Sequence, residues 1–419
     1  MSIALTSAVA NGPFKLLIRR KRPPLLAVPL NRRAWRKTRT SSFPSGHSAS
    51  AAAFAAGVAV EMPVLAAPLG LAAAGVAYSR VHTGVHYPGD VLVGVALGAA
   101  VGYGTTRVWP VAPHQAAQAR PSLVRSHEKP SADGAGIRFA VNAKAGPAIG
   151  GGDTAAELRA ALPGADVQVV EDGEDLGAVL RDLADGARAL GVAGGDGSIN
   201  AAAEVACAAG IPLVAVPAGT LNHLGRDLGL STVAQVVEAV REGEAVSIDV
   251  ATIADRVFLN TASFGSYVDL VDARERLEDR IGKWPALVVA LLRVLSGAEP
   301  VRVSIDGRER SVAMIFIGNC RYHPDGFAPS WRERLDDGLL DVRIVDASAP
   351  LARLRLLVSV LSGRLGRCRV YEQTLAREIT VESRQGPLRL ARDGEVFDGP
   401  ERFVIRKSDR PLTVYVPAE

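Results

Sequence analysis

Three short groups of residues near the start of the chain have the composition that phosphate-ester chemistry requires. They are Lys15 with Arg22 and Pro23, then Pro44-Ser45-Gly46-His47, and then Ser79-Arg80 with His86 and Asp90. A phosphomonoester dianion needs fixed cations, which Lys15, Arg22 and Arg80 can supply. A helix that opens at Ser45-Gly46 would add backbone N–H groups that suit an anion. The sequence therefore predicts a phosphate-binding site.

His86 and Asp90 are four residues apart, so they lie on one face if this segment begins a helix. Asp90 could then hold the imidazole in the tautomer that presents the other ring nitrogen as a nucleophile. Alternatively, His82 and His86 could bind a metal as in zinc helices, although no third ligand is offered. The other basic residues between positions 19 and 39, Arg20 included, are interpreted as an interfacial loop beside a membrane.

Farther along, two glycine-rich turns each follow an apolar stretch. They are Gly194-Gly195-Asp196-Gly197 and Gly219-Thr220-Leu221-Asn222. Glycines let backbone N–H groups approach phosphates at the start of a helix, and Asp196 could act on a nucleotide or a metal. The first turn alone could be an ordinary tight turn. Two such turns in adjacent strand–helix units, however, predict a cleft at the carboxyl edge of a sheet.

Three apolar stretches are expected to position the first set of residues, at 45–60, 64–78 and 91–108. Each is short, because about 20 residues are needed to cross a hydrocarbon core of ~30 Å. Buried helices of a soluble all-α phosphatase are therefore the alternative. Gly94, Gly98 and Gly102 recur every four residues and would let two helices approach closely. The pattern favours an all-α membrane bundle of three spanning helices.

The remaining chain divides by composition. Residues 110–136 are rich in Pro, Ala, Gln and Ser without periodicity, which is typical of a linker. From 137 onward, short apolar runs alternate with helical patterns and predict an α/β lobe. After Ser247, longer β-rich pieces, with turn signals at Asp306-Gly307 and Asp393-Gly394, predict a mainly antiparallel β lobe. The expected domains are a membrane domain at 1–109, a linker at 110–136 and a two-lobed domain at 137–419.

Composition limits the class of partner. The chain is 48% hydrophobic but only 5% aromatic, and the ten Lys and Arg residues between 15 and 39 lie beside the apolar stretches. This arrangement favours phosphate or anionic lipid over nucleic acid. The three cysteines have no zinc or disulfide spacing. The segment 351–365 interleaves Leu and Val with Arg, so it fits a membrane-surface helix and a core helix equally well.

Together, the first three groups match the signature of the type 2 phosphatidic acid phosphatase superfamily, which the chain resembles over about 8–108. The resemblance implies that His86 attacks phosphorus, while His47 protonates the leaving alkoxide and later activates water. No cofactor is implied. The remaining site residues would be Asp90, Arg80, Lys15, Arg22, Ser45 and Gly46. The family normally has further membrane helices ahead of Lys15, so either the true start lies upstream of Met1 or the bundle is truncated.

The glycine turns resemble those of the diacylglycerol kinase catalytic domain, a family shared with sphingosine kinases and related to NAD kinases, over about 137–417. The resemblance implies an ATP site made of Asn142, Gly194, Gly195, Asp196, Gly197, Gly219, Thr220 and Asn222. Asp249 and Asp393 would organise phosphate and Mg²⁺, and Glu395 would deprotonate the lipid hydroxyl. Asp337 and Asp341 lie where the bacterial family holds a structural magnesium ion.

Two positions need separate comment. His223 stands where the family usually has the Asp that follows Asn222, which implies altered substrate handling or a weaker kinase. The Asp393-Gly394 pair could be a simple hairpin turn. Glu395, directly after it, favours the functional interpretation.

The sequence as a whole predicts an enzyme with two activities. One is an ATP- and Mg²⁺-dependent lipid kinase, and the other is a histidine-dependent lipid phosphate phosphatase embedded in the cell membrane. A kinase of a soluble substrate such as NAD, and a non-catalytic lipid sensor, are the alternatives. Because ATP is cytoplasmic, the phosphatase site is expected to face the extracytoplasmic side, although the basic loop then departs from the positive-inside rule.

Overall fold

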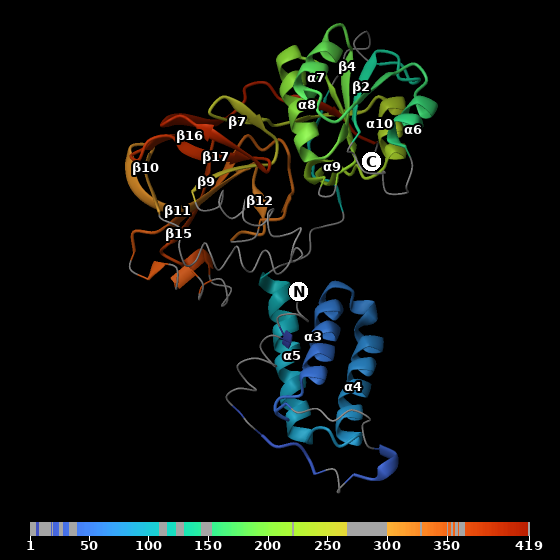
Figure 1. Cartoon of the computed structure of the whole chain (residues 1–419), viewed down its shortest axis with the longest axis vertical. Helices are drawn as coiled ribbons and strands as arrows, with labels where there is room; N and C mark the ends of the chain where they lie inside the picture. The colour runs from blue at the N-terminus through green and yellow to red at the C-terminus, as the bar shows by residue number, and fades with distance from the viewer. Residues whose placement is uncertain are drawn as a thin grey trace. The chain divides into compact units, whose positions relative to one another are not determined.

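The computed structural model comprises two compact units, Met1–Ala112 and Pro113–Glu419 (Figure 1). It describes residues 6–7, 18, 20–24, 28–32, 40–108, 115–122, 130–143, 153–219, 222–265, 300–326, 329–349, 351–352, 355–356, 359 and 365–417. Most of the predicted amphipathic segment 351–365 lies outside these residues.

Among the residues that the structure describes, the first unit contains a bundle of three long helices. They are α3 (Gly46–Glu61), α4 (Ala66–His82) and α5 (Pro88–Val108), with short 3-10 turns η2 (Leu30–Arg32) and η3 (Pro63–Leu65). The glycines at 94, 98 and 102 seat α5 directly on α3. A Cβ at Gly98 would lie only 2.0 Å from the carbonyl oxygen of Ala49, and a Cβ at Gly102 would lie 2.5 Å from that of Ala53. The predicted close approach of two helices is confirmed.

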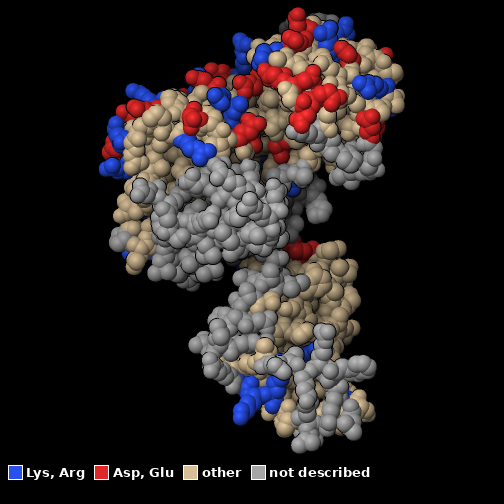
Figure 2. Space-filling model, viewed as in Figure 1, with Lys and Arg blue, Asp and Glu red and all other residues tan. Residues whose placement is uncertain are grey.

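The expectation of three spanning helices is only partly met. Two segments, Pro63–His82 and Pro88–Arg107, are long and apolar enough to cross a membrane. Helix α3 has 16 residues, about 24 Å at 1.5 Å per residue, because the chain turns at Met62-Pro63. Val64, in η3, and Leu71, on α4, expose 86% and 76% of their surface. The face drawn in Figure 2 is mainly uncharged over these helices, so this unit presents an apolar surface.

The first lobe of the second unit is a seven-stranded sheet with the order β1-β6-β20-β5-β4-β2-β3. Its strands are β1 (Arg120–Pro121), β2 (Ile137–Asn142), β3 (Asp166–Val170), β4 (Ala189–Gly194), β5 (Leu213–Pro217), β6 (Ala245–Ile248) and β20 (Leu412–Tyr415). The helices are α6 (Thr154–Ala161), α7 (Leu176–Ala184), α8 (Asp196–Ala209), α9 (His223–Asp227) and α10 (Val233–Glu242). The five neighbouring strands β3, β2, β4, β5 and β20 are parallel to one another. Every residue of β4, which lies at the centre of these five, is buried.

Part of the expected linker belongs to this lobe. Strand β1 pairs with β6, and the backbone N–H of Ala117 donates to the carbonyl of Asp227 at 2.6 Å. Ala117 and Ala119 pack against the core of the lobe. The prediction that residues 110–136 form a linker is therefore corrected for 115–122, because two small apolar side chains suffice to hold an edge strand.

The second lobe is a mainly antiparallel sheet, as predicted. Its strands are β7 (Ala251–Ile253), β8 (Arg256–Phe258), β9 (Thr261–Gly265), β10 (Val301–Ile305), β11 (Arg308–Asn319), β14 (Leu340–Asp346), β15 (Tyr371–Ala376), β16 (Glu378–Ser383), β17 (Leu388–Arg392), β18 (Glu395–Gly399) and β19 (Arg402–Lys407). A separate pair, β12 (Tyr322–His323) and β13 (Trp331–Arg332), and the turn η4 (Leu365–Arg367) complete it. Strand β20 then returns to the first lobe, so the chain connects the lobes twice.

Two predicted turns are two-residue hairpins. Ile305 pairs with Arg308 across Asp306-Gly307, and Arg392 pairs with Glu395 across Asp393-Gly394. All four turn residues have positive φ, from 44° to 89°, as a type I′ turn requires. The second hairpin determines where Glu395 emerges from the sheet.

Candidate active sites

The first candidate site lies at the end of the bundle where α3 and α5 begin and α4 ends. Ser45 is the N-cap of α3, and its N–H donates to the carbonyl of Asp90 at 2.9 Å. The N–H of His86 donates to the carbonyl of Arg80, at 3.2 Å. The structure thus brings the second and third predicted groups together with Arg22. Gly46 is buried and His47 is exposed in the first turn of α3, while Lys15 lies outside the described residues.

The imidazole of His86 is buried, and its Nδ1 lies 2.6 Å from the carbonyl oxygen of Ser42. A carbonyl cannot donate, so Nδ1 carries the proton and donates. Nε2 then bears the lone pair, 3.4 Å from Nη1 of Arg22. The expected direct bond to Asp90 is not seen, because Asp90 Oδ2 is 3.9 Å from Nδ1. The orienting partner is the Ser42 carbonyl, which sequence reasoning missed.

Asp90 is fully buried and accepts from three other groups. They are Arg20 Nη1 at 2.8 Å, the Tyr87 N–H at 3.0 Å and the Ser42 hydroxyl. These contacts correct the interpretation of Arg20 as part of a plain interfacial loop. Its spacing of two residues from Arg22 is the only signal that the sequence offers.

Arg22 is held by backbone carbonyls. Its guanidinium donates to Thr40 at 3.0 Å and to Val85 at 2.9 Å. Carbonyls hold the side chain without cancelling its charge, so Arg22 remains a cation beside His86 Nε2. An anion bound there would meet both a cation and a nucleophile.

The second candidate site lies at the carboxyl ends of β2, β4 and β5, where both glycine turns meet. A Cβ at Gly219 would lie 2.5 Å from Cα of Gly195, and a Cβ at Gly194 would lie 2.5 Å from Cβ of Ser198. Only glycines permit this contact between the turns. The side chain of Asn142, at the end of β2, donates to the Ser198 hydroxyl at 3.3 Å. The predicted cleft edge is therefore built from three adjacent strands.

The second turn is closed by its own side chains. Asn222 has a φ of 48° and bonds the N–H and the carbonyl of Gly219 at 2.9 and 2.8 Å. Asp196 Oδ1 accepts from the N–H of His223 at 2.7 Å, which ties the first turn to the second. Thr220 lies outside the described residues. The carboxylate of Asp196 is a hard oxygen donor beside the half-buried glycines 195, 197 and 219, so these residues fit a magnesium-bound phosphate.

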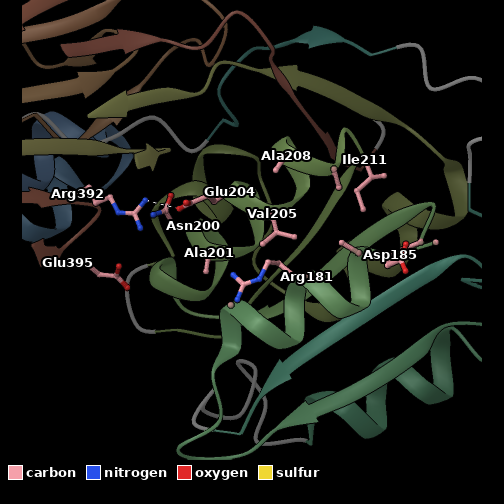
Figure 3. Close-up of a pocket in the computed structure, with 15 residues that line it drawn as sticks. Arg181, Asp185, Asn200, Ala201, Glu204, Val205, Ala208, Ile211, Arg392 and Glu395 are labelled. Atoms are coloured by element: carbon pink, nitrogen blue, oxygen red, sulfur yellow. Dashed lines mark hydrogen bonds and ion pairs between the residues drawn. The ribbon is translucent and has the colours of Figure 1, made fainter. Parts of the chain in front are cut away.

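Glu395 comes from the second lobe and lies over the first turn of α8. A Cβ at Gly197 would be 3.0 Å from Glu395 Oε1. Figure 3 shows Arg392 of the second lobe beside Asn200 and Glu204 of α8, with Glu395 nearby. These four residues line a cavity of about 810 Å³. Arg392 Nη1 pairs with Glu204 Oε2 at 2.9 Å. A carboxylate from one lobe therefore meets the glycine turns of the other.

Asp393 and Asp249, the two other carboxylates predicted for the kinase site, bond to groups outside the glycine turns. Asp393 accepts from the N–H groups of residues 259, 260 and 261, each at 2.8 Å. Burial raises the pKa of Asp393, and these three donors oppose that by stabilising its charge. Asp249 accepts from the Gly338 N–H at 2.7 Å and pairs with Lys407 at 3.0 Å. Among the described residues, neither carboxylate has a hydrogen bond to the glycine turns.

The structure describes the surroundings of Asp337 and Asp341, the predicted magnesium ligands. Asp341 is fully buried and pairs with Arg343 at 2.6 Å, because the two side chains share one face of β14. Among the described residues, the ligand atoms of Asp337 lie with those of Asp249 and Cys320, within 4.8 Å of one another, and Lys407 pairs with Asp249 there. The role of Asp337 and Asp341 as ligands of one magnesium ion stays a prediction.

Arg332 is a residue that sequence reasoning missed. Its buried guanidinium donates to Asp227 of α9 at 2.6 Å, to Asn260 Oδ1 at 3.0 Å and to the Leu259 carbonyl at 2.7 Å. The helix that follows the second glycine turn is thereby tied to the second lobe. Arg332 belongs to no recognisable sequence motif, so its contact with α9 could not have been predicted.

Known families match successive parts of the chain. The PAP2 superfamily matches residues 1–113, the diacylglycerol kinase catalytic domain matches 137–253, and the YegS C-terminal NAD kinase beta sandwich-like domain matches 268–411. The order agrees with the two resemblances seen in the sequence.

Individual proteins also match parts of the chain. A YegS-like lipid kinase of Pseudomonas aeruginosa is 31% identical over 257 residues, which cover 59% of this chain and 83% of that protein. A diacylglycerol kinase of Mycobacterium tuberculosis is 29% identical over 48% of this chain and 68% of that protein. A crystal structure described as a diacylglycerol kinase from Bacillus anthracis has a TM-score of 0.50 at 21% identity, covering 67% and 96% of the two chains. That likeness concerns the fold.

Proposed function

Because the chain belongs to the family of YegS-like lipid kinases and carries a PAP2-superfamily domain before its kinase lobes, we propose that it has two activities on lipids. The kinase transfers the γ-phosphate of ATP to a lipid hydroxyl. The phosphatase hydrolyses a lipid phosphate through a phosphohistidine. The observation that carries the proposal is Glu395, whose carboxylate lies over the first turn of α8 beside the glycine turns. The domain limits 1–109 and 137–419 are part of this proposal.

In the kinase, the glycine turns bind the phosphates of ATP through backbone N–H groups. Asp196 would hold Mg²⁺, and the bound ion would neutralise charge on the transferring phosphoryl group. Glu395 accepts the proton of the lipid hydroxyl, and Asn142 supports the first turn through Ser198. The cavity beside Glu395 supplies an approach for the acceptor. Arg332 holds the two lobes together through its bonds to Asp227 and Asn260.

In the phosphatase, Nε2 of His86 attacks phosphorus while the bond to the lipid oxygen breaks. Arg22, with Lys15 and Arg80, neutralises the phosphate, and the start of α3 at Ser45-Gly46 adds backbone N–H donors. His47 protonates the departing alkoxide and then activates the water that hydrolyses the phosphohistidine. These roles need a cation and an oriented imidazole side by side, which the 3.4 Å between Arg22 and His86 supports.

The apolar helices of the chain favour a lipid acceptor over NAD. Two segments are long and apolar enough to cross a membrane, and α4 exposes large apolar side chains. Such surface is stable against hydrocarbon but not against water. The enzyme is therefore proposed to be integral to the membrane, with ATP and membrane lipids as its partners.

The test is an assay of purified chain in detergent with radiolabelled γ-ATP. We expect label in a chloroform-soluble product with diacylglycerol and related lipid alcohols, and none in NADP when NAD is the acceptor. Chelation of divalent metal should abolish transfer. Label in NADP and none in lipid would refute the lipid kinase.

The phosphatase has a separate test. With a ³²P-labelled lipid phosphate, His47→Ala should still form labelled protein slowly, because the nucleophile remains, whereas His86→Ala should form none. Acid-labile, base-stable label would identify the bond as phosphohistidine. Equal labelling of both variants would exclude His86 as nucleophile.

A further inference from the structure

We propose that Arg20 is a positioning residue of the phosphatase site, which holds Asp90 in place so that Asp90, through Ser42, orients the imidazole of His86. The inference rests on the proposed phosphatase. It assigns a function to a residue that the sequence places in a plain basic loop. The structure carries it in four steps.

The first step is the burial of charge. Asp90 is 0% exposed, and a buried carboxylate is stable only when it is paired and hydrogen-bonded. The described charged or titratable groups that face Asp90 are Arg20, Arg22 and His86. Only Arg20 bonds it directly, Nη1 to Oδ1 at 2.8 Å, whereas Arg22 donates to carbonyls. Arg20 is therefore the counter-ion.

The second step is the role of Ser42. Its hydroxyl donates to Asp90 Oδ2, and its backbone carbonyl accepts from Nδ1 of His86 at 2.6 Å. One residue thus bonds the carboxylate with its side chain and the imidazole with its main chain. Any shift of Asp90 moves the carbonyl that sets the tautomer of His86.

The third step is the turn between His86 and Asp90. The guanidinium of Arg20 lies 4.3 Å from the centre of the Tyr87 ring, and the Tyr87 N–H donates to Asp90 Oδ2 at 3.0 Å. A cation over an aromatic face is attracted to it. Arg20 therefore holds this turn both through the ring and through the carboxylate.

The fourth step is the charge that appears during reaction. When Nε2 bonds to phosphorus, the imidazole, protonated at Nδ1, becomes positive. Asp90 lies 3.9 Å from Nδ1 and stabilises that charge while it is ionised. Without Arg20, Asp90 would lose its hydrogen-bonded counter-ion, and the Ser42 residue that orients His86 would lose a fixed partner.

The experiment uses the full chain in lipid nanodiscs with ¹⁵N-labelled histidine. Arg20→Gln removes the cation, Arg20→Lys retains it, and Lys21→Gln removes an exposed neighbouring cation as the matched control. The His86 signals are assigned by their absence in His86→Ala. Two quantities are measured, the His86 tautomer from ¹⁵N shifts and the kinetics of lipid phosphate hydrolysis.

For Arg20→Gln we expect a mixture of tautomers and a kcat lower by roughly 10- to 100-fold with little change in KM. Arg20→Lys should restore most of kcat, and Lys21→Gln should match the wild type. If Arg20→Gln proves unfolded by thermal melting, Ser42→Ala is judged by the same readouts and should shift them in the same direction.

Two results separate the proposals. If Arg20→Gln and Lys21→Gln give the same tautomer and the same kcat, the role of Arg20 is refuted even though the wild type hydrolyses lipid phosphate. If the wild type hydrolyses none but Arg20→Gln still changes the His86 tautomer, the phosphatase is refuted and the positioning stands.

Discussion

Glu395 is the residue on which the proposed kinase depends most directly. Replacing it with Gln preserves shape and hydrogen bonding but removes the base, so turnover should fall by roughly 10²-fold or more. ATP affinity should be unchanged, because the glycine turns are intact. Initial rates with a lipid acceptor and equilibrium ATP binding measure the two effects.

Asp398→Asn is the matched control, since this exposed carboxylate lies on the same strand β18. It should turn over like the wild type. If Glu395→Gln keeps near-normal turnover, Glu395 is not the base.

His223 gives a pH dependence whose sign can be worked out. Partial burial of its imidazole, with repulsion from Arg226 and Arg332, lowers the pKa of His223 despite Asp196 and Asp227. The folded state thus binds the proton less well than the unfolded state, whose pKa is about 6.5. Stability from this group is present above that pH and is lost as pH falls through the folded pKa.

We therefore expect the thermal midpoint of the wild type to fall relative to that of His223→Asn between pH 7 and pH 5. Above pH 7.5, where His223 is neutral in both states, the gap between the variants should stay constant. Melting curves in detergent at several pH values provide the measurement. A gap that is constant down to pH 5 would contradict the lowered pKa.

At the scale of elements, the contact between α3 and α5 determines the geometry of the phosphatase site. Ser45 at the start of α3 bonds Asp90 at the start of α5, so a change in helix spacing must disturb the site. A Cβ at Gly98 would lie 2.0 Å from the Ala49 carbonyl, which a rigid backbone cannot accommodate. Gly98→Ala should destabilise the unit by about 1–3 kcal/mol, as overpacking does.

Gly104→Ala is the control on the same helix, because nothing lies within 4 Å of its added Cβ. It should be neutral or slightly stabilising, since Ala favours a helix. Thermal unfolding and phosphatase rate are measured for both variants. Equal behaviour of the two would show that the helices are not in the close contact described.

At the scale of the whole molecule, the proposal implies a definite sidedness. The phosphatase residues gather at the end of the bundle where α5 begins, and α5 leads the chain to its other end. If α5 crosses the membrane and the kinase meets cytoplasmic ATP, the phosphatase faces the extracytoplasmic side. The two activities would then act on opposite leaflets and would not simply reverse each other.

This topology is tested in a chain whose three native cysteines have been replaced. A cysteine at Thr38 should react with a membrane-impermeant thiol reagent in intact cells, whereas one at Ser131 should react only after lysis. The reverse pattern would overturn the topology and restore the positive-inside arrangement of the basic loop.

Much of the architecture could be predicted from the sequence because its causes are local. Alternating apolar runs and helical patterns predicted the α/β lobe, and the Asp-Gly pairs at 306 and 393 predicted two hairpins. Glycines every four residues predicted the contact of α5 with α3. Each of these depends on the conformations that neighbouring residues allow, which the chain specifies without reference to distant segments.

Only the tertiary structure decided which charges pair. Arg20 and Asp90 are 70 positions apart, and Arg332 and Asp227 are 105 apart, so no spacing rule relates them. Asp341 shows the same limit, because the sequence did not predict that its buried carboxylate pairs with Arg343. A buried charge must find a partner wherever the fold brings one within hydrogen-bond distance. The sequence determined which residues could do chemistry, and packing determined which of them face one another.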